Sequence, residues 1–186
     1  MLINNDTIIK DDNPLIREKS FDVDLPLSKE DEELLMDMLN YVIESTDEEL
    51  SKEKNLRPAV GISAIQVGKN KKLTAIVIKD ADGNIKYKYA LANPKIVSYS
   101  VEKAYLKSGE GCLSVAKEHE GLIYRPARIK VKAYDALKKE NVIIKASNYL
   151  AIVFQHELDH FKGILFYDHI NKDNPLYEDP NAIAIE

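Results

Sequence analysis

Apolar residues recur at helical spacing in the first quarter of the chain. They share one face of an α-helix at Leu34, Leu35, Met38, Leu39, Val42 and Ile43. Ser28, which precedes acidic residues 30–32, is typical of a helix start because its side chain can cap backbone N–H groups. Pro14 predicts a second, shorter helix through about Lys19. The charged segment 45–57 fits either a helix extension or an exposed loop.

From Leu73 onward the pattern becomes that of β-strands. The segments LTAIVIK and IKYKYALAN flank Asp82-Gly83, a dipeptide typical of a tight turn, and therefore predict a hairpin. Further strand-like pieces lie at residues 95–98, 101–106, 128–134 and 142–145. The middle of the chain is therefore expected to be mostly antiparallel β-structure.

A final helix is expected from Ser147 or Asn148 to about Phe161, ended by Gly163. It is apolar over much of its circumference, which indicates a buried, central helix. The tail, from about residue 168 to 186, contains two prolines and is expected to be irregular. Together these elements predict an α+β fold, with antiparallel sheets packed around the C-terminal helix and helices at the N-terminus, in a single domain spanning 1–186.

Composition narrows the class of protein. The chain has 186 residues, a net charge of −5 and one cysteine. The negative balance argues against broad binding to nucleic acids or anionic membranes, although it leaves room for a small basic patch. A lone cysteine forms no internal disulfide, and neither a signal peptide nor an apolar run long enough to cross a bilayer stands out. We expect a cytoplasmic protein with no membrane partner and no stable nucleic-acid complex.

The final helix carries the motif QHELDHFKG. His156 and His160 are four residues apart, so both imidazoles lie on one face and can bind one metal ion. Glu157 stands beside them, and His-Glu-x-x-His on a helix is typical of metal hydrolases in which the glutamate is a general base. Two unrelated core histidines would be the simpler interpretation, but an uncompensated buried glutamate beside them would be costly.

A catalytic site of this kind usually has three protein ligands and one open position. The motif itself leaves the third ligand undecided. His169 and Glu178 are candidates in the tail, as in zinc endopeptidases. Cys112, inside the glycine-flanked segment GEGCLSV, is the other candidate, and one thiolate with two imidazoles suits iron(II), zinc, nickel or cobalt.

At these residues the chain resembles the peptide deformylase family. The family's EGCLS motif matches residues 110–114, and its QHExDHxxG motif matches residues 155–163 at every specified position. Its first motif, G-φ-G-φ-A-A-x-Q, matches residues 59–66 with two departures, Ala59 for glycine and Ser63 for alanine. Both substitutes are small, so close backbone approach is expected to survive. The resemblance covers about residues 12–167, and the long charged segment before the first motif is similar to the longer bacterial type.

The resemblance implies a hydrolase that removes the formyl group from the N-terminal formylmethionine of newly made proteins. It implies one divalent metal, iron(II) by family, held by Cys112, His156 and His160, with metal-bound hydroxide attacking the formyl carbon. Glu157 would be the general base and acid. By the same resemblance, the side chain of Gln66 and the backbone N–H of Leu113 would donate hydrogen bonds to the oxyanion that forms during the reaction.

Substrate binding is the least constrained part of this interpretation. Gly61 and Ile62 are candidates for binding an extended N-formylmethionyl peptide, Gly61 through backbone hydrogen bonds. Candidates for the methionine pocket are apolar residues that could equally be core: Ile62, Tyr124, Ile152 and Val153. Contact with the ribosome, if made, is expected to be transient and not through a C-terminal helix.

One further expectation concerns an ion pair near Cys112, and three rival functions stay open. Glu110 and Arg125 are expected to form a buried ion pair that orients the cysteine segment. The rivals are a zinc endopeptidase with its third ligand in the tail, a metal- or peptide-binding module without turnover, and an esterase acting on another small acyl group. Glu157 and Gln66 speak against a non-catalytic module, because binding alone needs neither.

Overall fold

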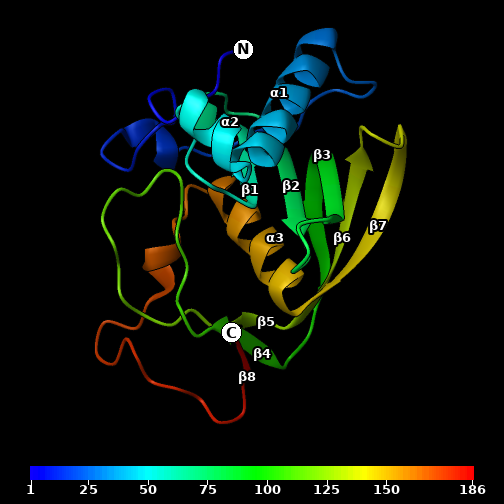
Figure 1. Cartoon of the computed structure of the whole chain (residues 1–186). Helices are drawn as coiled ribbons and strands as arrows, with labels where there is room; N and C mark the ends of the chain where they lie inside the picture. Colours follow the sequence, from blue (N-terminus) through cyan, green and yellow to red (C-terminus); the bar gives the residue numbers. More distant parts are fainter.

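The computed structural model describes all 186 residues, and two β-sheets organise it (Figure 1). The larger sheet has five antiparallel strands in the order β1-β2-β3-β6-β7. Their bounds are Gly61–Ser63 for β1, Leu73–Lys79 for β2, Ile85–Tyr99 for β3, Arg128–Asp135 for β6 and Glu140–Ser147 for β7. The smaller sheet has the order β5-β4-β8, with bounds Arg125–Pro126, Lys103–Leu106 and Ile183–Ile185.

Three α-helices accompany the sheets: α1 (Lys29–Ser45), α2 (Glu48–Glu53) and α3 (Asn148–His160). The predicted start of α1 is confirmed, because the Ser28 hydroxyl accepts a hydrogen bond from the backbone N–H of Asp31. Beyond α3, Gly163 has a φ of +70°, and a side chain there would collide with the backbone of Arg17. Glycine is therefore required where the chain leaves the helix.

The larger sheet is covered on both faces at β2, near one of its edges. Alternate residues of β2 point to opposite sides, so Ala75 and Val77 pack in one core cluster with α1, whereas Ile76 and Ile78 pack in another with α3. Burial on both faces explains why β2 reads as a continuous apolar run and not as an alternating one. Figure 1 shows α3 lying against the sheet in the middle of the molecule, as the predicted buried helix requires.

The predicted fold class, α+β with antiparallel sheets around a central C-terminal helix, is confirmed by this arrangement. Several local expectations were incomplete. The helix at Pro14 is one 3-10 turn ending at Arg17, and part of the charged segment forms the separate helix α2. Residues 85–99 form one strand and not two, because a register shift between Ala92 and Lys95 accommodates Pro94 within it.

The tail is more ordered than its prolines predicted. Phe166–His169 form a 3-10 turn, and Ile183–Ile185 form β8, which pairs in parallel with β4. The expected irregular tail over 168–186 is therefore wrong for its last residues, which gain backbone hydrogen bonds from a strand distant in sequence. None of the helices has both the length and the apolar character needed to cross a bilayer.

Candidate active site

Three ligand-type side chains converge where α3 meets the loop of residues 107–124. Cys112, His156 and His160 place one donor atom each within 4.8 Å of one another. The Cys112 Sγ lies 3.5 Å from His160 Nε2, and the two imidazole centres are 5.4 Å apart, one helical turn along α3. Donors held at 2.0–2.3 Å in a tetrahedral site lie roughly 3.5 Å apart, so the residues fit one metal ion.

The nitrogen atoms available to a metal follow from the other contacts of each ring. Nδ1 of His156 lies 2.9 Å from a carboxylate oxygen of Glu110. Nε2 of the same ring is therefore the nitrogen that is available to a metal beside Cys112 Sγ. His160 is only 1% exposed, and its Nδ1 has no hydrogen-bond partner. The orientation of His156 is therefore fixed by a carboxylate, whereas that of His160 is fixed by packing.

Burial and neighbouring charge act against each other on these groups. Burial raises the pKa of Cys112, but the imidazoles of His160 and His156 outweigh it and hold that pKa well below the ordinary range. A thiolate is the form of cysteine that binds metals. Burial also raises the pKa of Glu157, against the opposing effect of the two imidazoles, so this carboxyl group holds a proton more readily than an exposed glutamate.

A buried ionic network supports the cysteine segment, and the predicted Glu110–Arg125 ion pair is confirmed. Arg125 donates to both Glu110 oxygens, at 2.8 and 3.0 Å, and to Asp159 of α3 at 2.8 Å. The Glu110 and Arg125 side chains are about equally buried, with exposures of 4% and 5%. Burial raises the pKa of Glu110, but His156 and Arg125 together lower it to about 2, so the carboxylate stays charged.

Replacing Arg125 with leucine should destabilise the protein and weaken its metal site. The change leaves the buried Glu110 carboxylate without its arginine and takes one partner from Asp159, and breaking a buried ion pair in this way costs about 3–5 kcal/mol. It also removes the partner that holds Glu110 against His156, and loss of such a support typically lowers metal affinity about 10–100-fold. Denaturant unfolding and metal titration measure the two effects.

The matched control is Arg128→Leu, because Arg128 is also paired with one glutamate, Glu102, but at the surface. An exposed pair contributes only about 0–1 kcal/mol, so this variant should unfold and bind metal nearly as the unmodified protein does. Equal behaviour of the two variants would contradict an orienting role for Arg125.

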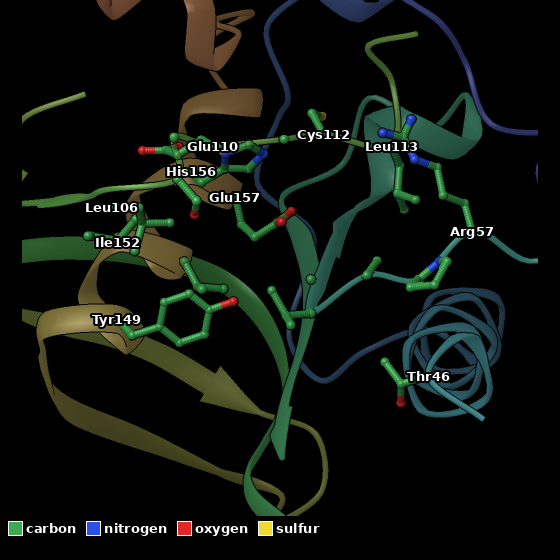
Figure 2. Close-up of a pocket in the computed structure, with 18 of the residues that line it drawn as sticks. Thr46, Arg57, Leu106, Glu110, Cys112, Leu113, Tyr149, Ile152, His156 and Glu157 are labelled. Carbon is green, nitrogen blue, oxygen red and sulfur yellow. Dashed lines mark hydrogen bonds and ion pairs between the residues drawn. The ribbon is translucent and has the colours of Figure 1, made fainter. Parts of the chain in front are cut away.

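The Glu157 carboxylate is confined by residues of β1, next to the loop of residues 107–124 that carries Cys112. The Ser63 hydroxyl lies 2.9 Å from Glu157 Oε2 and 3.0 Å from the Glu157 carbonyl oxygen, so it can donate to either. A Cβ atom on Gly61 would lie 2.6 Å from Glu157 Oε1, so glycine leaves the space that the carboxylate occupies. Figure 2 shows Glu157 projecting from α3 into the pocket, with Cys112 above it. The serine that departs from the family motif thus bonds a residue of the site.

Gln66 and Leu113 stand beside the sulfur. The Gln66 side chain is 1% exposed, and its Oε1 accepts a hydrogen bond from the backbone of Ser63. Its Nε2 lies 3.1 Å from the Ser114 hydroxyl and 3.5 Å from Cys112 Sγ. The backbone N–H of Leu113 donates no hydrogen bond within the protein. Two N–H donors of different origin are therefore fixed near the predicted ligands.

The pocket at this site has a volume of about 530 Å³. Gly61, Ile152 and Val153 line it, whereas the Ile62 side chain is fully buried in the core with α1 and Tyr124 lies beside a different hollow. The lining residues that sequence reasoning missed include Arg57, Leu106, Tyr149 and Glu186. Figure 2 shows Tyr149 and Arg57 on opposite sides of the pocket. No sequence motif marks these four residues, because loop packing and the β4–β8 pairing bring them together.

The other candidate ligands lie elsewhere. His169 Nε2 is 2.8 Å from Asp159 Oδ2 and is not part of the group formed by Cys112, His156 and His160. Glu178 is exposed in the tail and also stands outside that group. The geometry therefore gives no support to an endopeptidase-type site with a third ligand in the tail.

Comparison with known proteins gives consistent matches along the chain. The family model described as polypeptide deformylase matches residues 5–175. Peptide deformylase 2 of Bacillus subtilis is 48% identical over 185 residues, which cover 100% of both chains. Peptide deformylase of Staphylococcus epidermidis is 44% identical, over 99% of this chain and 100% of the relative. Among solved structures, a probable peptide deformylase from Synechococcus phage S-SSM7 superposes with a TM-score of 0.70 at 30% identity, covering 88% of this chain and 98% of the other.

Proposed function

The chain belongs to the polypeptide deformylase family, and from this premise we propose which of its residues remove the N-formyl group from newly made peptides. The observation that carries the proposal is the convergence of Cys112, His156 and His160 beside the confined carboxylate of Glu157. The family implies a divalent metal, and these three side chains would hold it. When bound, such a metal supplies Lewis acidity and lowers the pKa of water toward neutrality.

Glu157 is the group that moves protons in this proposal. Its carboxylate lies in the pocket, is only 4% exposed and has a pKa raised by burial, which suits a group that takes a proton and then returns it. The Ser63 hydroxyl can donate a hydrogen bond to the carboxylate, and the absence of a side chain at Gly61 leaves the space that the carboxylate occupies. Proton delivery to the leaving amine would complete the release of formate.

Gln66 and Leu113 would stabilise the negative charge that develops on the formyl oxygen. The Leu113 N–H is free of internal partners, and the Gln66 amide is held by Ser63 and Ser114 next to the sulfur. Fixed donors of this kind need no reorganisation during the reaction, and loss of one typically costs about 10²–10³ in rate. Gln66→Ala should show that loss in kcat with unchanged metal content, and an unchanged kcat would remove Gln66 from this role.

The peptide itself would bind along β1. This strand is at an edge of the larger sheet and is paired only with β2, so the other edge of Gly61–Ser63 can accept the backbone of an extended peptide. Gly61 lies in the pocket wall and would bind the peptide through its backbone, whereas Ile62 would contribute only by holding β1 in place, since its side chain is buried and its main chain pairs with β2. Ile152 and Val153, together with Leu106 and Tyr149, offer the apolar wall for methionine.

We infer that the resident metal is iron(II), as the family resemblance implies, with zinc, nickel and cobalt able to bind the same donors. A low-pKa thiolate beside iron(II) is prone to oxidation. Activity of protein purified without oxygen should therefore decline on exposure to air, and zinc-loaded protein should resist that decline. Equal loss in both forms would speak against iron as the cause.

The remaining expectations concern the setting of the reaction. We propose that residues 1–186 act as one catalytic domain in the cytoplasm, where nascent chains carry formylmethionine, with transient contact to the ribosome. The C-terminal segment forms β8 against β4, so it offers no helix for such a contact.

A direct assay tests the function. Protein purified without oxygen is given a formyl-Met tripeptide and, separately, an unformylated peptide of equal length. The expected result is release of formate from the first and no cleavage of the second. Internal cleavage of the unformylated peptide would instead support an endopeptidase, and hydrolysis of small acyl esters in preference to the formyl peptide would support an esterase.

A further inference from the structure

A shallow hollow on the outer surface of β6 and β7 has no part in the reaction. Its volume is about 370 Å³, and no aspartate or glutamate lines it. Its polar lining combines three cations with three serine hydroxyls: Arg128, Lys130, Lys145, Ser98, Ser100 and Ser147. This combination of positive charge and hydroxyl donors suits a phosphate group.

The two lysines are held together by strand register. Ile129 and Val131 of β6 and Ile144 of β7 belong to the core cluster that packs against α3. Because successive side chains alternate, Lys130 and Lys145 point to the opposite, exposed face. They are direct partners in the β6–β7 ladder, and like charges in that position destabilise a sheet. A bound anion would relieve the repulsion.

Most donors in the hollow are unused within the protein. Lys130 and Lys145 form no ion pair or hydrogen bond, and the hydroxyls of Ser98 and Ser147 form no hydrogen bond. Only Arg128 has a charged partner, Glu102, at 2.6 Å. The chain carries a net charge of −5, so a cluster of free cations here is not a reflection of its overall composition.

The positive surface is longer than one phosphate group. Lys132 follows Lys130 by two residues in β6. It is the partner of Lys95 in β3, and both side chains are exposed. Tyr99 also lines the hollow and is 56% exposed. A row of cations with an exposed aromatic ring is the pattern by which proteins bind single-stranded nucleic acid, through backbone charge and base stacking.

We propose that this surface binds an RNA backbone. The choice of RNA rests on the proposed function, because a peptide that still carries its formyl group emerges beside ribosomal RNA. Figure 1 shows β6 and β7 at the side of the molecule opposite the loop of residues 107–124 that carries Cys112. The pocket can therefore stay open to the peptide while this surface contacts RNA.

The test measures binding of the full-length protein to a labelled single-stranded RNA of about 16 nucleotides, by fluorescence anisotropy over a range of salt. The variant is K130A/K145A, and the control is K19A/K172A, which removes the same charge from exposed lysines without ion pairs. We expect roughly tenfold or greater loss of affinity for K130A/K145A at about 50 mM salt, and a salt slope lower by roughly 1.5. The control should bind as the unmodified protein does.

Two more measurements separate RNA from other anions. Tyr99→Ala should weaken RNA binding roughly 5–100-fold, because it removes a stacking ring, and Tyr177→Ala, at a similarly exposed tyrosine, should not. All variants should deformylate a formyl-Met tripeptide at the unmodified rate, so failure of this proposal is distinguishable from failure of the catalytic one. Equal RNA affinity of the K130A/K145A and K19A/K172A proteins would overturn the RNA proposal. So would binding of phosphatidylglycerol vesicles or inorganic phosphate that depends on Lys130 and Lys145 while RNA binding does not.

Discussion

Glu157→Gln should lower kcat on a formyl-Met peptide by about 10²–10⁴-fold while the protein keeps its fold and its metal. The amide has the size of the carboxyl group, so it fits the space left by Gly61. It cannot take up a proton and return it, however, and the reaction needs both transfers. Steady-state kinetics with metal analysis of the same sample measures the effect. KM should change much less than kcat, since the proposed peptide site runs along β1 and does not depend on the Glu157 carboxylate.

A matched control for this change is Glu178→Gln, at an exposed glutamate in the tail. That variant should retain full activity, since Glu178 is exposed and is not part of the group of donors. A Glu157→Gln protein that holds metal and turns over at the unmodified rate would exclude Glu157 as the proton-transfer group.

Cys112→Ala should abolish stable metal binding and, with it, nearly all activity. Two imidazoles on one helix remain, but a site with two protein ligands lacks the donor set that mononuclear catalytic sites use. The expected result is a metal content near zero after dialysis, against about one ion per chain in the unmodified protein. Elemental analysis after dialysis is the measurement.

Two controls make the Cys112 result specific. Cys112→Ser preserves size and polarity but offers a hydroxyl that stays protonated, so it should bind metal far more weakly than the thiolate. Unmodified protein stripped by a chelator should lose activity and recover it when metal returns. A Cys112→Ala protein that kept both metal and activity would mean that another residue completes the site.

Much of the site could be predicted because its chemistry is local in sequence. His156, Glu157 and His160 share a helix, so their spacing alone places them around one point. Cys112 could not be placed by spacing, because the convergence depends on a loop that crosses from β4 to β5. Only the resemblance to a family motif connected it to the helix.

The parts that could not be predicted depend on long-range packing. β8 exists because the tail pairs with β4, and no local pattern in IAI distinguishes it from an irregular segment. Ile62 looked like a pocket residue, yet its side chain turns into the core on the face covered by α1. The contact between Ser63 and Glu157 joins residues 94 positions apart, so the sequence marked Ser63 only as a departure from a motif.

The most direct test of the account is X-ray absorption spectroscopy of the zinc-loaded protein. The spectrum should contain one sulfur neighbour at about 2.3 Å and two imidazole nitrogens at about 2.0–2.1 Å, with any remaining neighbour a light oxygen atom. A zinc shell made only of nitrogen and oxygen would show that the Cys112 thiolate does not bind the ion, and would contradict the assignment of this site.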